Sequence, residues 1–90
     1  MELKEARKRI SRIDAEMAEL FLRRMTAAGE IAACKRERGL PIEDIEQEAR
    51  VIEAHSGQIE DETLRSLYVC FLQNVIDVSK RWQRHVINDP

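Results

Sequence analysis

The sequence has few of the residues that interrupt helices or build compact cores. Its 90 residues include three glycines, two prolines and 4% aromatic residues, against 43% hydrophobic and 36% charged residues. This composition is typical of a soluble, all-helical protein. No apolar run is long enough to span a membrane, and no signal or transit peptide is recognisable. We therefore expect no membrane association and a location in the reducing cytoplasm.

The charges and the cysteines argue against two further classes of protein. The formal charge is −2 with acidic and basic residues interspersed, so there is no basic patch for nucleic acid. Cys34 and Cys70 each lie alone, without the close Cys or His spacing that a zinc site requires. We expect two buried free thiols and no metal.

The longest helical pattern covers residues 2–38, a stretch with no proline and a single glycine. Apolar residues recur along it at heptad spacing, which predicts an amphipathic helix. Such a helix would be about 54 Å long, whereas a compact globule of this chain length is roughly 30 Å across. The rest of the chain cannot cover it, so the length alone predicts a homodimer in which long helices lie against each other. The main apolar positions are Leu3, Ile10, Met17 and Ile31.

Two cations interrupt this helix on one side. Arg24 occupies a heptad position where a buried aliphatic residue is expected, and burying a lone guanidinium costs several kcal/mol. Lys35 follows three turns later, so both face the same way with Cα atoms about 16 Å apart. The two side chains could close on one small anion, or Arg24 could instead fix the register of a coiled coil. Arg7 lies about 42 Å from Lys35, so it would reach such a site only from the other subunit.

Two more helices are predicted after the stop at residues 39–41, Gly-Leu-Pro. An acidic segment opens a short helix that finishes near residue 57, and Asp44 and Glu48 project together from it. Helix capping and solubility are the simpler explanation of these two acids considered alone. Residues 63–87 form the third helix, in which Ser79 and Gln83 interrupt an apolar row. The opposite face of that helix is expected to supply core residues: Leu64, Leu67, Phe71, Val75, Val78 and Trp82.

The polar residues on these apolar faces can be combined into one site. A pocket between bundle helices, lined by cations, an amide, a hydroxyl and carboxylates, suits a small polyanion that carries a hydroxyl. The sequence offers no nucleophile paired with a base, no metal cluster and no glycine-rich phosphate loop. An enzyme of this kind would work through positioning and electrostatics.

Five motifs follow one another in order along nearly the whole chain: Arg7-x-x-Ile10-Ser11-x-x-Asp14, Leu20-x-x-x-Arg24-Met25, Ile31-x-x-x-Lys35, Pro41-Ile42-x-Asp44-x-x-x-Glu48 and Ser79-x-x-x-Gln83. Together they resemble the all-helical type II (AroQ-class) chorismate mutases. The resemblance implies a single domain of this family over residues 1–90 and an intertwined homodimer of three-helix subunits. It also implies the cofactor-free Claisen rearrangement of chorismate to prephenate, in the shikimate pathway of aromatic amino acid biosynthesis.

The resemblance implies a role for each matching cation and donor. Arg24 and the partner subunit's Arg7 would hold the substrate carboxylates, with help from Ser79. Lys35 and Gln83 would donate hydrogen bonds to the ether oxygen, where negative charge grows as the C–O bond breaks.

The acidic segment carries the remaining implied contacts and one departure from the family. Asp44 and Glu48 would orient the ring hydroxyl. Family members usually have arginine where this sequence has Gln47, which can still donate a hydrogen bond to the substrate. Arg50, one turn later, is the other candidate to supply the missing cation.

Two alternative functions stay open from the sequence. An isochorismate-pyruvate lyase would resemble the mutases in fold and in its cationic pocket, although Asp44 and Glu48 suit a hydroxyl placed as in chorismate. A non-catalytic helical module for dimerisation or regulation would need no turnover at all.

Overall fold

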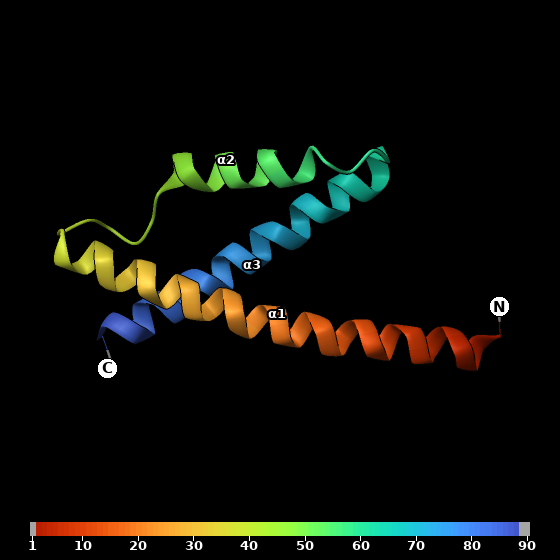
Figure 1. Ribbon diagram of the computed structural model, residues 1–90. Coiled ribbons are helices and arrows are strands. Elements are labelled where there is room, and N and C mark those ends of the chain that lie inside the picture. The colour runs from red at the N-terminus through yellow and green to blue at the C-terminus, as the bar shows by residue number, and fades with distance from the viewer. Residues whose placement is uncertain (1, 89–90) are drawn as a thin grey trace.

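A computed structural model describes residues 2–88, and every element in them is a helix (Figure 1). The helices are α1 (Leu3–Glu37), α2 (Ile45–Ser56) and α3 (Glu62–Asn88). The predicted all-α class, with a very long first helix, a short second and a long third, is confirmed. The predicted helix boundaries agree with the observed ones to within a few residues.

Local sequence signals explain where these helices begin and end. Gly39 follows α1 with a φ of 67°, a conformation that a residue without Cβ adopts at little cost. The turn is closed by Leu40 N, which donates to Lys35 O at 2.8 Å. Asp44 caps α2, because its Oδ1 accepts from Gln47 N at 3.1 Å. These signals set the direction in which the chain leaves α1 and enters α2.

The third helix joins the other two. α3 packs against both α1 and α2, whereas α1 and α2 do not pack against each other within residues 2–88 (Figure 1). Small residues on α1 allow a close crossing, since a Cβ on Gly29 would lie only 3.4 Å from Trp82 Nε1. The buried residues at this crossing are Met25, Ala28, Gly29 and Ala32 from α1 and Leu72, Ile76, Ser79 and Gln83 from α3.

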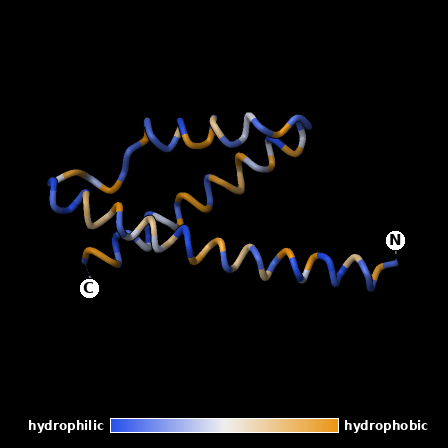
Figure 2. Tube along the Cα trace, in the orientation of Figure 1, coloured by the Kyte–Doolittle hydropathy of each residue, from blue (hydrophilic) through white to orange (hydrophobic). Residues whose placement is uncertain are grey.

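The first half of α1 is an arm that the rest of the subunit does not cover. Every residue from Leu3 to Arg23 is exposed except Ala6, which is half-buried. The radius of gyration is 16.1 Å, against about 12 Å for a compact chain of this length. Hydrophobic residues recur along this arm (Figure 2). The largest exposed ones are Leu3, Ile10, Ile13, Met17, Leu20, Phe21 and Leu22.

Two expectations about burial are wrong for the single subunit. Cys34 and Cys70 are free thiols as expected, but both are exposed. The apolar row of α3 that was expected in the core is also largely uncovered: Leu64, Leu67, Phe71, Val78 and Trp82 are each at least 40% exposed, and Val75 is half-buried. None of the helices in the described residues has the length and apolar content needed to cross a membrane.

Candidate active site

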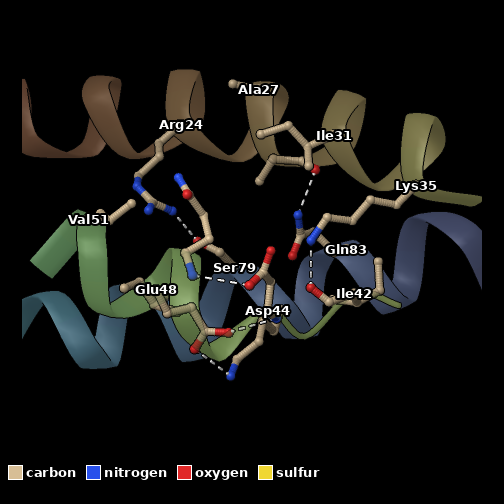
Figure 3. A pocket seen from close by; sticks show the side chains of 14 residues that line it. Arg24, Ala27, Ile31, Lys35, Ile42, Asp44, Glu48, Val51, Ser79 and Gln83 are labelled. Atoms are coloured by element: carbon tan, nitrogen blue, oxygen red, sulfur yellow. Dashed lines mark hydrogen bonds and ion pairs between the residues drawn. The ribbon is translucent and has the colours of Figure 1, made fainter. Parts of the chain in front are cut away.

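A cavity of about 310 Å³ lies where the three helices meet, and it contains every predicted site residue except Arg7 (Figure 3). Its walls come from α1, α2 and the loop between them, with α3 across the base. The lining residues are Arg24, Ala27, Ala28, Ile31, Lys35, Ile42, Asp44, Gln47, Glu48, Val51, Ile76, Ser79, Lys80 and Gln83. Arg7 lies in the exposed arm, about 25 Å along α1 from Arg24.

Arg24 and Lys35 present two cations to this cavity from one side of α1. Both side chains are half-buried, and neither forms an ion pair with any residue in the described part of the chain. Lys35 Nζ donates to Ile42 O at 2.9 Å, which uses one of its three N–H groups. Two partly desolvated cations without a carboxylate partner make this side of the cavity receptive to an anion.

Ser79 holds Arg24 in place. Arg24 Nη1 donates to Ser79 Oγ, and the Ser79 hydroxyl donates its own proton to Val75 O at 2.8 Å (Figure 3). The hydroxyl is therefore already engaged as both donor and acceptor. It orients the guanidinium, and it would have to release Val75 before it could donate to a ligand.

Gln83 is the buried amide at the base of the cavity, with 8% of its surface exposed. Its Nε2 donates to Ala28 O at 3.0 Å. A carbonyl oxygen facing another carbonyl would be repulsive, so this contact fixes which end of the amide is the donor. Nε2 carries a second N–H that this contact does not use.

The acidic wall is built around the start of α2. Asp44 is the helix cap, so the simpler interpretation of this residue from the sequence holds for its Oδ1. Asp44 N in turn donates to Glu48 Oε2 at 3.3 Å. Asp44 Oδ1 and Glu48 Oε2 thus each accept one backbone N–H at the start of α2, and both residues line the cavity.

Gln47 lines the cavity, and its side-chain amide is hydrogen-bonded to Arg50. Arg50 is exposed and does not line the cavity; its Nε donates to Gln47 Oε1 at 3.1 Å. Arg50 therefore does not bring its cation into the cavity. By occupying the oxygen of the Gln47 amide, it leaves the Nε2 end free to act as a donor.

Lys80 is a cavity residue that the sequence reasoning missed. Its Nζ lies 3.0 Å from Glu48 Oε1 and 3.2 Å from Glu43 Oε1. The hydrogen bond to Glu48 raises the pKa of the Lys80 ammonium above its ordinary value of 10.5, with a smaller contribution from Glu43, while burial acts in the opposite direction. The sequence could have indicated this position, because Ile76, Lys80 and Gln83 share one side of a helix at spacings of four and three.

Comparison with known families identifies the chain. Residues 6–84 match the model of one family, chorismate mutase type II. Searches of curated proteins and of solved structures gave no match. The matched range contains every residue that lines the cavity. Because the match covers most of the sequence, the chain belongs to the type II chorismate mutase family and is an isomerase.

Proposed function

We propose that this protein converts chorismate to prephenate in the cavity between its three helices, without a cofactor, and that two subunits are needed to complete each site. The observation that carries the proposal is the pair of cations, Arg24 and Lys35, that line the cavity and have no carboxylate partner in the described residues. Chorismate is a dianion, so fixed cations at both ends of the cavity suit its two carboxylates and its polar ether bridge.

The cations and the buried amide of the cavity have different proposed roles in binding and in catalysis. Arg24 binds one carboxylate and the partner subunit's Arg7 binds the other, while Ser79 acts by holding Arg24. Lys35 and Gln83 donate to the ether oxygen, which gains negative charge as the C–O bond breaks. Donors aimed at a charge that develops during reaction stabilise the transition state more than the bound substrate. Lys35 Nζ and Gln83 Nε2 each have at least one N–H that is not used in their hydrogen bond to the protein backbone.

The acidic wall recognises the ring hydroxyl of chorismate. Asp44 and Glu48 accept its hydrogen bond with the carboxylate oxygen capacity that capping leaves unused. Gln47 donates to the substrate through its Nε2, in place of the arginine usual in the family. The confined cavity favours the compact conformer in which the reacting carbons approach each other.

A second copy of the chain is the proposed cover for the arm of α1 and for the outer face of α3. Both surfaces expose large apolar side chains, and a patch of this extent on a lone subunit is costly in water. Pairing two copies through their arms carries each Arg7 towards the other subunit's cavity. We also propose that the enzyme works in the cytoplasm.

The decisive experiment is a chorismate depletion assay on the purified chain, with the native mass measured on the same sample. We expect prephenate as the product and a dimeric mass. Isochorismate is tested in parallel, because pyruvate and salicylate from isochorismate, with no prephenate from chorismate, would identify the lyase instead. A folded dimer that consumes neither substrate would refute the proposed reaction.

A further inference from the structure

Lys80 is held by carboxylates from three segments of the chain. Its Nζ contacts Glu48 on α2 at 3.0 Å, Glu43 on the loop before α2 at 3.2 Å and Asp77 on α3 at 3.7 Å. Of these three acids only Glu48 lines the cavity, and it is also the least exposed, at 24% of its side chain against 55% and 64%. Lys80 itself is 13% exposed, so this is a constrained cluster and differs from an ordinary surface ion pair.

The two oxygens of Glu48 are held very differently. Oε1 accepts from Lys80 at 3.0 Å, whereas Oε2 accepts from Asp44 N at the longer distance of 3.3 Å. Without Lys80, the carboxylate would keep only the weaker of these contacts and could rotate towards water. α2 packs only against α3 in the described residues, so Lys80 is also the ionic link between the acidic wall and the helix beneath it.

Lys80 also compensates the charge of Glu48 within the cavity. The lining residues of one subunit include the cations Arg24, Lys35 and Lys80 and the carboxylates Asp44 and Glu48, a net charge of +1. Without Lys80, the carboxylate of Glu48 would have no cation within ion-pair distance among the described residues. α2 itself provides no lining cation, so the only compensation for Glu48 at close range comes from α3.

We propose that Lys80 is a positioning residue of this active site, which fixes the Glu48 carboxylate so that it accepts the hydrogen bond of the substrate's ring hydroxyl. The inference rests on the proposed function and adds a residue to it. Lys80 acts through Glu48, so its effect depends on the substrate hydroxyl. A purely structural ion pair would affect all substrates alike.

The test compares Lys80→Met with wild type on two substrates, chorismate and the analogue in which hydrogen replaces the ring hydroxyl. On chorismate we expect kcat/KM to fall about 10- to 100-fold, the range for losing a hydrogen bond between charged groups. On the analogue we expect a change of less than about threefold. Lys80→Arg should recover most of the loss on chorismate, because it restores the cation. Arg84→Met is the charge-matched control, since Arg84 lies one turn further along α3, is exposed and does not line the cavity.

A double variant protects the test against simple misfolding. Glu48→Gln combined with Lys80→Met leaves no unpaired charge between these two positions, and it should lose no more activity than Glu48→Gln alone. Equal losses on both substrates, or an unchanged kcat/KM for Lys80→Met, would overturn the role of Lys80 while wild-type turnover still supported the proposed function. Absence of wild-type turnover would overturn both.

Discussion

If each active site takes one arginine from the other subunit, two inactive variants should restore activity to each other. Arg7→Ala removes the cation on the arm, and Arg24→Ala removes the one in the cavity. Arg7 lies about 25 Å along the same rigid helix from Arg24, so no side-chain movement could bring both into one cavity of one subunit. Each variant alone is expected to form a folded dimer with little turnover.

The size of the recovery follows from the symmetry of the dimer. The two variants are unfolded in urea, mixed in equal amounts and refolded together, so that pairing is random. Half of the dimers then contain one subunit of each kind. In such a dimer one cavity has Arg24 and receives an intact Arg7, and the other has neither, so about a quarter of wild-type activity should return. Chorismate consumption per subunit is the measurement.

A matched pair of variants separates this result from general rescue. Arg24→Ala mixed with Lys35→Ala removes two residues that line the same cavity, so every mixed dimer has one defect in each site and no activity should return. Failure of the first mixture to recover, or recovery in this control, would refute the shared site. High activity of Arg7→Ala alone would remove Arg7 from it.

Four further predictions follow from the contacts within the subunit. Gln83→Met should lower kcat/KM about 10²- to 10³-fold while changing the free energy of unfolding by less than about 1.5 kcal/mol. Kinetics and urea titration measure the two quantities. A loss of folding free energy larger than the loss of transition-state stabilisation would contradict a catalytic donor. Turnover of the wild type should be nearly flat from about pH 5 to 8, since the proposed rearrangement transfers no proton; a steep bell in the rate profile would require another mechanism. Gly29→Ala should raise the free energy of unfolding by up to about 1 kcal/mol, because alanine favours a helix over glycine and its Cβ would lie 3.4 Å from Trp82 Nε1, an ordinary contact distance. The larger side chain of Gly29→Leu should instead destabilise the crossing by about 1 to 3 kcal/mol. The pKa of Lys80 is raised chiefly by its hydrogen bond to Glu48, so the ion pair stabilises the fold fully below pH 10.5 and this stabilisation is lost as the pH rises through the higher pKa of the folded state. The difference in melting temperature between wild type and Lys80→Met should therefore shrink at such a high pH. A constant difference would argue against the ion pair.

The sequence was sufficient to predict the parts of this molecule that depend on helical periodicity. Arg24 and Lys35 could be assigned to one side of α1 because a single rigid helix fixes their spacing. The position at which α1 ends could also be predicted from the sequence, since Gly39 has the positive φ that such a position requires. Ser79 and Gln83 could be placed on one face of α3 for the same reason, although the helix that this face crosses and their hydrogen-bond partners could not be predicted.

Features that depend on how two helices lie against each other were not predictable. Helical spacing places Lys80 on the side of α3 that carries Ile76 and Gln83, but its partner could not be predicted, because α2 brings Glu48 to 3.0 Å from it only in the folded chain. Arg50 was a reasonable candidate for the cavity by helical spacing, but its contact with Gln47 keeps it outside. Exposed Cys34 and Cys70 show the same limit, because an apolar pattern predicts that a face is covered without saying which chain covers it.

The core of one subunit connects folding to catalysis. Among the described residues no large side chain is less than 2% exposed, and the buried positions of α1 are mostly small, at Ala28, Gly29 and Ala32. Such a core is unlike that of an independently stable domain of this length, and in the proposed dimer a second copy would supply most of the apolar burial. The arm that would supply this burial is also the segment that carries Arg7. If the proposed dimer is correct, folding, dimerisation and completion of the active site are one event, and the melting temperature should rise with protein concentration together with the fraction of active sites.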